Sequence, residues 1–243
     1  MEISVMPTVS IIIPMHNEEQ NVKQVIKEVN TALKKHHLKG EIIAVDDRST
    51  DNTEKILDKL KEKNNLLKVI HRSGDVNRIE IGWAIRDGIN AVKCSVVAIM
   101  MGDSSDDPED MVKMVNKIKN GYDIVIGSRF CEGGEIYGYP SGRLIFNRLC
   151  NYFVKYLFRL RTNDISNAFK VYRRDAIKSI KIESPDFNVL VEIPLKLIKK
   201  GFRYTQVPVK WFGRKKGVSK LKVLRIGPNY LKTIFKIFIS DSI

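Results

Sequence analysis

Short apolar runs recur through the first half of the chain, and segments with a helical spacing of apolar positions separate them. Runs that are apolar at successive positions predict strands buried on both faces, as in the middle of a parallel sheet. The strands predicted in this way are Thr8–Pro14, Glu41–Val45, Leu66–Ile70, Val96–Met101 and Tyr122–Gly127. Regular alternation of strand and helix predicts an α/β fold with a doubly wound, Rossmann-like, mostly parallel central sheet and helices on both faces.

Helices are predicted where apolar residues fall on one helical face. The first is expected to begin at Asn17 as its N-cap, with an apolar stripe from Val22 to Leu33. Further helices are predicted at Ile79–Val92 and Pro108–Lys119, the second with Pro108 in its first turn.

After Arg129 the alternation changes. Glycine-containing residues 132–142 predict a mobile loop. The predicted elements that follow are a helix at Leu144–Leu160, a strand at Ala168–Tyr172, a helix at Val189–Lys200 and an edge strand at Tyr204–Trp211. The helix at 144–160 has a broad apolar surface and a stripe of basic residues, which suits either a membrane interface or a core helix with a basic rim.

The C-terminal segment Lys220–Ile239 repeats this amphipathic pattern, with Tyr230, Leu231 and Phe235 among the residues of its apolar face. Gly227 and Pro228 are expected to break the helix before that face. Without an internal repeat or a low-complexity linker, the sequence predicts one domain at residues 1–221 and an amphipathic membrane-interface segment at 222–243.

Composition narrows the class of protein. The chain has 243 residues, 43% of them hydrophobic, which excludes a disordered protein. Its net charge is +14, and every charged side chain from Leu195 to Ser240 is Lys or Arg, which favours an anionic partner such as phosphate, nucleic acid or an anionic membrane surface. No apolar run reaches the ~20 residues of a membrane span, and the cysteine spacing fits neither a metal site nor a disulfide framework. We therefore expect a cytoplasmic protein.

Acidic residues gather where two predicted strands end. Asp103 follows the strand at 96–101, with Ser105, Asp106 and Asp107 beside it. The carboxyl ends of strands in open α/β sheets bind ligands, and these oxygen donors suit a divalent cation that holds a diphosphate. For Asp106 and Asp107 a helix cap is an equally good interpretation. A second acidic group begins at Asp46 and Asp47, after the strand at 41–45.

Five motifs in order resemble those of the inverting GT-A glycosyltransferases that include dolichol-phosphate mannose synthase. They are Pro14–Glu19, Val45–Asp51, Met101–Asp103, Gly127–Phe130 and Arg214–Leu221. The family transfers a sugar from a nucleotide diphosphate donor, of the GDP-mannose or UDP-glucose type, to a polyprenyl (dolichyl) phosphate at the membrane with a divalent cation.

The resemblance assigns roles by position. It implies that Pro14, His16 and Glu18 border the nucleotide and that Asp46 or Asp47 contacts its base or ribose. Asp103 corresponds to the second aspartate of the family's Asp-x-Asp motif and Ser105 to a further position at the Mg²⁺ or Mn²⁺ site. Met101 replaces the first aspartate, and a thioether is a poor ligand for these cations. Asp106 is a candidate replacement ligand.

The resemblance also assigns the basic residues. Arg129 and Arg143 match positions that hold the acceptor phosphate, although Asn147 stands where the family often has serine. Arg214, Ser219 and Lys220 match a loop that closes over the donor diphosphate. Lys170 stands where the family commonly has arginine, and Glu192 matches a frequently acidic position.

The sequence is also compatible with other functions. A transferase with a protein or soluble glycan acceptor is the nearest alternative, and the loss of an aspartate at Met101 also allows a non-catalytic membrane-surface protein with this fold. Binding to nucleic acid is supported by charge alone, because the sequence has no recognition helix or stacking-aromatic module, and we expect none.

Overall fold

The computed structural model describes residues 8–76, 80–214, 216 and 223–240, with the backbone alone for 223–226. Within these residues a seven-stranded sheet has the order β3-β2-β1-β4-β7-β5-β8. β7 is antiparallel to β4 and β5, and the other neighbouring pairs are parallel. The strands are β1 (Val9–Met15), β2 (Gly40–Asp46), β3 (Leu67–His71), β4 (Val96–Ile99), β5 (Ile124–Ser128), β7 (Lys170–Arg173) and β8 (Tyr204–Pro208). The prediction of a mostly parallel sheet is confirmed, but the sequence did not predict the reversal of β7.

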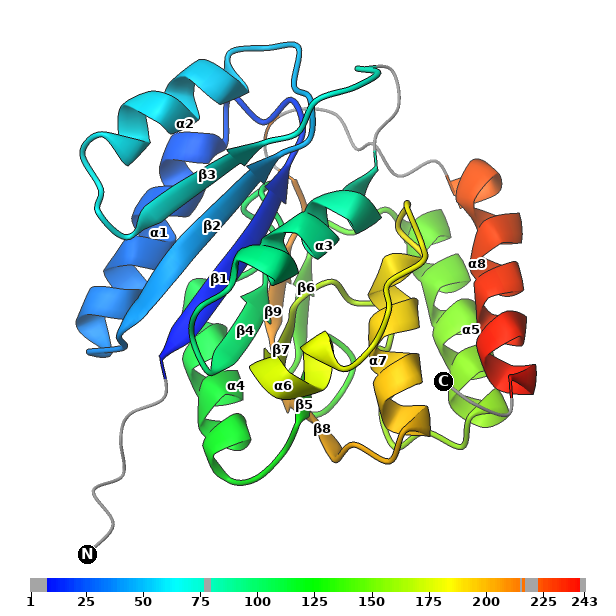
Figure 1. Cartoon of the computed structure of the whole chain (residues 1–243). Helices are drawn as coiled ribbons and strands as arrows, with labels where there is room; N and C mark the ends of the chain where they lie inside the picture. Colours follow the sequence, from blue (N-terminus) through cyan, green and yellow to red (C-terminus); the bar gives the residue numbers. More distant parts are fainter. Residues whose placement is uncertain (1–7, 77–79, 215, 217–222, 241–243) are drawn as a thin grey trace, which may run out of the picture.

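Helices cover both faces of this sheet (Figure 1). One face packs against α1 (Val22–Lys35), α2 (Thr53–Lys61) and α4 (Pro108–Lys119). The other packs against α3 (Ile81–Ala91), α6 (Arg174–Lys178) and α7 (Val189–Lys199), with α5 (Ser141–Leu157) and α8 (Val223–Ile239) beyond α7.

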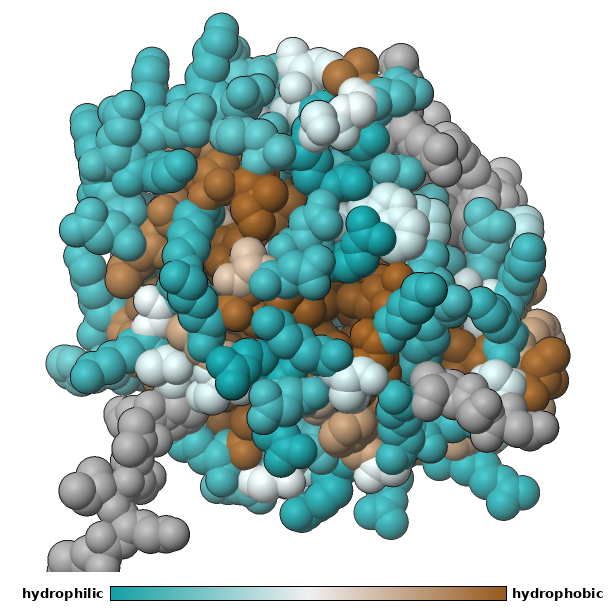
Figure 2. All heavy atoms as spheres, in the orientation of Figure 1, coloured by the Kyte–Doolittle hydropathy of each residue, from teal (hydrophilic) through white to brown (hydrophobic). Residues whose placement is uncertain are grey.

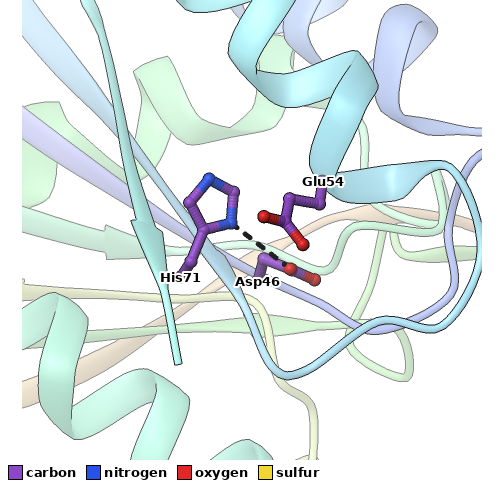
Figure 3. A group of neighbouring side chains, drawn as sticks. All are labelled: Asp46, Glu54 and His71. Carbon is purple, nitrogen blue, oxygen red and sulfur yellow. Dashed lines mark hydrogen bonds and ion pairs between the residues drawn. The ribbon is translucent and has the colours of Figure 1, made fainter. Parts of the chain in front are cut away.

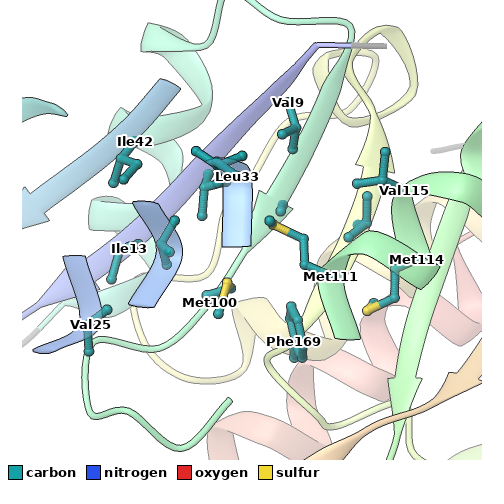
Figure 4. Close-up of a cluster of buried hydrophobic side chains, with 14 of the residues drawn as sticks. Val9, Ile13, Val25, Leu33, Ile42, Met100, Met111, Met114, Val115 and Phe169 are labelled. Carbon is teal, nitrogen blue, oxygen red and sulfur yellow. The ribbon is translucent and has the colours of Figure 1, made fainter. Parts of the chain in front are cut away.

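Alternate residues of each central strand enter two separate cores. Ile11 and Ile13 of β1 belong to the cluster under α1 and α4, whereas Ile12 packs toward α3. Figure 4 shows the first cluster, in which Met111 of α4 and Phe169 lie close to the β-sheet residues. Burial on both faces explains why the strand sequences are continuously apolar.

The first strand and helix differ from prediction at their ends. β1 continues through Pro14 to Met15, because its pairing with β4 ends at Ile12 and Pro14 is paired only with β2. Asn17 is not the N-cap of α1: its backbone is left-handed with φ 51°, and its side-chain oxygen accepts a hydrogen bond from the Thr50 N–H instead. The helix begins at Val22.

The predicted loop at 132–142 contains secondary structure. β6 (Glu135–Tyr137) pairs in parallel with β9 (Lys210–Phe212), and α5 already begins at Ser141. The predicted edge strand Tyr204–Trp211 is therefore two strands, β8 in the main sheet and β9 in this small sheet. We call the two strands β6 and β9 the β6–β9 ribbon.

The predicted break at Gly227–Pro228 is also wrong, since α8 runs unbroken from Val223 to Ile239. Pro228 lies inside the helix, where it lacks the N–H that would donate to the carbonyl four residues earlier. Ile234 and Ile237 of α8 are buried in the core beside α7. At the other end of α8, the Lys199 ammonium donates to the carbonyls of Ile237 at 2.7 Å and Phe238 at 3.0 Å. The predicted membrane segment is thus packed on the domain.

Gly82 provides a test of how tightly α3 packs. Its N–H donates to the Pro185 carbonyl at 2.8 Å, and an added Cβ would lie 2.7 Å from the Pro185 carbonyl carbon and still closer to the Ser184 oxygen. We expect Gly82→Ala to lower the free energy of unfolding by about 1 to 3 kcal/mol, because backbone atoms cannot move aside cheaply. Urea denaturation measures this change. Gly142→Ala is the control, since its added Cβ has no neighbour within 4 Å; an equal loss of stability in both variants would contradict the prediction.

Candidate functional site

The carboxyl ends of β1, β2 and β4 meet at one edge of the sheet. In the register of the strands, Met15 lies opposite Asp46, and Ile12 lies opposite Ile99. The loop after β4 then crosses the end of β1: a Cβ on Gly102 would lie 3.0 Å from the Pro14 carbonyl oxygen. Strand pairing therefore brings together the predicted motifs at Pro14, Asp46 and Asp103.

The loop after β4 gives its acidic residues different roles. Asp107 caps α4 by accepting from the Glu109 N–H at 3.0 Å, so the capping interpretation is confirmed for it. Asp106 is buried and accepts from the Met101 N–H at 3.0 Å. Burial raises the pKa of Asp106 to about 7, and the charge of Asp103 adds to that shift while the Met101 N–H opposes it. Asp103 is more exposed than Asp106, and one of its oxygens accepts from the Ser105 N–H at 3.1 Å.

Arg214, which follows β9, reaches across the same edge. Its guanidinium donates to both carboxylate oxygens of Glu18, at 3.1 and 2.9 Å, and to Asp103 at 3.1 Å. These three side chains come from the segments after β1, β4 and β9, and we call them the Arg214 cluster. The sequence named all three residues but did not predict that they contact one another.

A cavity of about 570 Å³ lies beside the Arg214 cluster. Asp103, Ser105, Asp106 and Arg214 line it, and so do Arg129 and Arg143. Its other walls include α5, α8, Trp211 of the β6–β9 ribbon, the segments 138–140 and 166–168, and the residues before and at the start of α7. The cavity therefore collects the predicted metal and acceptor residues that the structure describes.

Arg129 is held in place by a buried partner that the sequence analysis missed. Its Nε and Nη2 donate to the two oxygens of Asp164 at 2.8 and 2.7 Å, and both side chains are nearly inaccessible. Burial lowers the pKa of the Arg129 guanidinium, but the Asp164 carboxylate more than reverses this, so the arginine stays charged. The segment Asp164–Lys170 (DISNAFK), just before and at the start of β7, carries the acid, but nothing in its pattern marks Asp164 as the partner.

Polar side chains of α5 join this pair to the cavity. Asn147 and Asn151 both donate to the Ser166 hydroxyl, at 3.0 and 2.8 Å, and the Ser166 N–H donates back to Asn151. Asn147 lines the cavity where the family often has serine. The network fixes α5, and with it Arg143, relative to Arg129.

Lys170 and Glu192 are buried and form hydrogen bonds with backbone groups of neighbouring segments. Lys170 is fully buried, donates to the Asn167 and Leu190 carbonyls, and has a pKa lowered by burial to about 7. Glu192 is buried and accepts from the Glu183 and Ser184 N–H groups at 2.8 Å and from Lys196 at 2.6 Å. Neither residue lines the cavity.

The predicted donor residues lie at the same edge of the sheet, at the ends of β1 and β2. Nδ1 of His16 is 2.7 Å from the Asp47 carbonyl oxygen. The Asp47 carboxylate is buried and binds the guanidinium groups of Arg48 and Arg72 and the Glu80 N–H. Each of these contacts orders the loop after β2, so Asp47 has to exchange a partner before it can contact a nucleotide.

Asp46 is buried as well, but its side chain has different partners from that of Asp47. It accepts from the Ser49 hydroxyl, and its other oxygen is 3.4 Å from His71 Nδ1. Figure 3 shows Asp46, Glu54 and His71 facing one another. One ligand atom of each residue lies within 4.8 Å of the others, an arrangement that can hold a metal ion. Nε2 of His71 contacts Asp58 at 3.1 Å. Burial lowers the pKa of His71, but Asp58 and Asp46 raise it above its ordinary value, which favours the charged imidazolium beside these acids.

The described residues only partly fit a divalent cation at the loop after β4. Asp103 offers a hard oxygen ligand, whereas the Met101 side chain offers only a thioether. Asp106 is buried, and one of its oxygens already accepts a hydrogen bond from the Met101 N–H. A cation at Asp103 therefore needs most of its ligands from a donor diphosphate and water. Two predicted residues of the closing loop, Ser219 and Lys220, lie outside the described residues.

α5 and α8 present an exposed apolar surface next to the cavity. Their rings meet at Phe153 and Phe235, with centroids 6.0 Å apart, and at Phe158 and Phe238, 5.5 Å apart. We call this surface the α5–α8 face. Its exposed apolar residues are Ile145, Phe146, Leu149, Tyr152, Phe153, Tyr156, Leu231, Phe235, Phe238 and Ile239. Figure 2 shows hydrophobic atoms at the rim of the molecule where α8 lies.

The cavity opens on the α5–α8 face, since Phe146 and Leu231 line the cavity and are also 46% and 44% exposed. Arg148 of α5 stacks on Phe130 and Tyr152, at 4.0 and 4.5 Å from the ring centroids. Among the described residues, the helices are all too short or too polar to cross a membrane.

Comparison with known proteins identifies the family. The model of Glycosyl transferase family 2 matches residues 10–181. Polyprenol monophosphomannose synthase of Mycolicibacterium smegmatis is 28% identical over 236 residues, 93% of this chain and 84% of that protein. Dolichol-phosphate mannosyltransferase of Pyrococcus furiosus is 30% identical over 94% of this chain, which spans 63% of that relative's length.

Solved structures agree on the fold. Glucosyl-3-phosphoglycerate synthase from Mycobacterium tuberculosis, in complex with Mn²⁺, UDP and glucosyl-3-phosphoglycerate, matches with a TM-score of 0.72 at 18% identity, covering 97% of this chain and 82% of that one. Its complex with Mg²⁺ and UDP matches with a TM-score of 0.70, covering 97% and 81%. The family match over most of the chain and the shared fold show that this protein is a glycosyltransferase of family 2 with the GT-A fold.

Proposed function

We propose that the protein transfers a mannose- or glucose-type sugar from a nucleotide diphosphate donor to a polyprenyl phosphate at a membrane surface, with inversion at the anomeric carbon. The observation that carries this proposal is the continuity of the cavity, which extends from Asp103 past Arg129 and Arg143 to the α5–α8 face. A phosphate with a long apolar chain matches a basic cavity that opens on an apolar surface. The two relatives, a polyprenol monophosphomannose synthase and a dolichol-phosphate mannosyltransferase, support the same acceptor class.

The donor is assigned to the edge formed by the ends of β1, β2 and β4. Pro14 and His16 border the nucleotide, and Asp46 or Asp47 contacts its base or ribose after exchanging one internal partner. Glu18 and Asp103 face the diphosphate with Arg214, and Ser219 and Lys220 belong to the loop that closes over it. The Mn²⁺ and Mg²⁺ complexes of the structural neighbours support Mg²⁺ or Mn²⁺ as the cofactor, held by Asp103 with Ser105 or Asp106.

The acceptor phosphate is assigned to Arg143 and Arg129. The exposed Arg143 side chain lies at the cavity wall on α5, whereas Arg129 is fixed by Asp164 and contributes positive potential from a rigid position. Forked guanidinium donors suit phosphate oxygens. Asn147 supplies an amide at the position where the family often has a hydroxyl.

The reaction is a single in-line displacement. A phosphate oxygen of the acceptor forms a bond to the anomeric carbon while the bond from that carbon to the donor diphosphate breaks, which releases the nucleoside diphosphate. The acceptor is already an anion near neutral pH, so it needs orientation more than a general base. Arg214 stabilises the charge that develops on the leaving diphosphate, and a bound divalent cation would share that charge.

The α5–α8 face is proposed to lie on an anionic membrane, which makes the protein peripherally associated with the cytoplasmic side. Its apolar side chains enter the lipid boundary, and the basic residues of both helices and the chain's excess positive charge attract anionic headgroups. The mouth of the cavity then faces the lipid phosphates.

A donor and acceptor screen tests the function as a whole. Purified protein is given GDP-mannose or UDP-glucose, with Mg²⁺ or Mn²⁺, and nucleoside diphosphate release is followed with polyprenyl phosphate, with a soluble glycan or without acceptor. We expect release that depends on polyprenyl phosphate. Release with a soluble glycan alone would favour a soluble acceptor, and nucleotide-sugar binding without any turnover would indicate a non-catalytic protein.

Asp103→Asn is expected to reduce transfer by about 100-fold or more, because it removes the carboxylate assigned to the cation that would hold the diphosphate. Asp175→Asn is the matched control, since the Asp175 side chain is 78% exposed on α6. Steady-state transfer rates measure the effect, and circular dichroism checks that both variants fold. Turnover like that of the wild type in Asp103→Asn would remove this residue from the site.

Arg143→Ala is expected to weaken use of polyprenyl phosphate by about 10- to 150-fold in kcat/KM, the value of one charge-assisted contact. Donor binding, measured by calorimetry, should stay unchanged because the donor is assigned to the ends of β1, β2 and β4, whereas Arg143 lies on α5. Arg161→Ala, an exposed arginine outside the cavity lining, is the control. Arg129→Ala is less informative, because it leaves Asp164 buried without its partner and is expected to cost about 3 to 5 kcal/mol of stability. Loss of donor binding in Arg143→Ala would refute the assignment.

The α5–α8 face is tested by sedimentation with vesicles. We expect binding to vesicles of phosphatidylcholine with phosphatidylglycerol, and release as salt screens the headgroup charge. Replacing Leu149 and Phe235 together by serine should weaken binding by about tenfold or more through lost apolar burial. Leu66→Ser is the control, because Leu66 is a 38% exposed apolar residue next to β3, outside this face. Equal binding to neutral and anionic vesicles at every salt concentration would count against this orientation.

A further inference from the structure

The Arg214 cluster is a charged contact at the point where the donor diphosphate is proposed to bind. Arg214 and Asp103 are each 15% exposed and Glu18 is 6% exposed, so solvent screens these charges weakly. Glu18 is fixed from a second side by the Asn21 amide, which donates to it at 2.7 Å. The cluster is therefore an ordered contact between distant segments, unlike a pair of mobile surface charges.

Both oxygens of Asp103 are engaged within this arrangement. One accepts from the Ser105 N–H at 3.1 Å and the other from Arg214 at 3.1 Å. A divalent cation needs direct bonds to carboxylate oxygen, and a guanidinium on the same oxygen opposes it by charge and by volume. Met101 offers no alternative anchor because its side chain is a thioether, and one oxygen of Asp106 is already engaged by the Met101 N–H.

A nucleotide diphosphate changes this competition. Its oxygens are better partners for the Arg214 guanidinium than the Asp103 carboxylate, which shares that guanidinium with Glu18. The diphosphate oxygens also supply ligands for a cation. Movement of Arg214 from Asp103 to the diphosphate frees one oxygen of the Asp103 carboxylate for the cation. The diphosphate brings its own oxygen ligands at the same time.

We propose that Arg214 is an internal counter-cation of Asp103, which a divalent cation replaces only when a nucleotide diphosphate draws the guanidinium away. Cation and nucleotide then enter the site together, and the free protein binds the cation weakly. This inference rests on the proposed function for the identity of the nucleotide, but the competition between Arg214 and the cation is a property of the described side chains.

The test is Mn²⁺ binding, followed by electron paramagnetic resonance of the free ion, with and without GDP or UDP. Without nucleotide, Arg214→Gln is expected to bind Mn²⁺ about tenfold or more tightly than the wild type, because the competing charge is gone. Adding nucleotide should tighten Mn²⁺ binding strongly in the wild type and much less in Arg214→Gln. Asp103→Asn should abolish the tight binding in both backgrounds, which locates the ion.

Two controls separate competition from general effects. Arg203→Gln removes one positive charge from an exposed arginine that stacks on Tyr122, away from the cluster, and should bind Mn²⁺ like the wild type. Arg214→Lys keeps the charge and should stay close to the wild type. Thermal unfolding confirms that each variant is folded before titration.

Equal Mn²⁺ affinity of wild type and Arg214→Gln without nucleotide would overturn the inference, as would an equal gain in Arg203→Gln or in Arg214→Lys. Failure of the proposed function gives a different result: calorimetry would then show no binding of GDP, UDP or their sugars to the wild type. The comparison of Arg214→Gln with the wild type in the absence of nucleotide would still report on the competition.

Discussion

The parallel pairing of β1 with both β2 and β4 is the constraint on which the site depends. It places the ends of three strands at one edge of the sheet, so Pro14, Asp46 and Asp103 become neighbours although they are far apart in sequence. Gly102 lets the loop after β4 approach the end of β1, where a larger residue would meet the Pro14 carbonyl. Continuous apolar strands buried on both faces hold this register, because a slip by one residue would expose one core and bury polar groups in the other.

Several buried side chains near this edge form ion pairs. Arg129 with Asp164, and Asp47 with Arg48 and Arg72, link loops that the hydrophobic cores do not reach. Such pairs add little net stability, since their desolvation offsets their attraction, but breaking one leaves an unpaired buried charge. Their effect is to fix geometry: Arg129 keeps its position and its charge beside a cavity lined by Asp103 and Arg143.

The role proposed for the amphipathic helices α5 and α8 depends on how they lie relative to each other. α8 buries Ile234 and Ile237 against α7 and turns Leu231, Phe235 and Phe238 outward beside the exposed residues of α5. The same helices form walls of the cavity through Phe146 and Leu231. An apolar surface and a cavity lined by three arginines are thereby joined, which is the geometry that the proposed acceptor, an amphipathic lipid phosphate, requires.

The sequence by itself determined the α/β class, most of the strands and helices, the GT-A resemblance and the candidate residues from Pro14 to Arg214, because hydrophobic period and local motif spacing are properties of neighbouring positions. Only the tertiary structure decided which of these residues meet. The antiparallel insertion of β7, the pairing of β6 with β9 and the unbroken course of α8 through Pro228 depend on contacts between distant segments. The same holds for Asp164 as the partner of Arg129 and for the contact of Arg214 with both Glu18 and Asp103. Pairing across such separations is selected by packing and by the need to satisfy buried charge, and no local pattern records it.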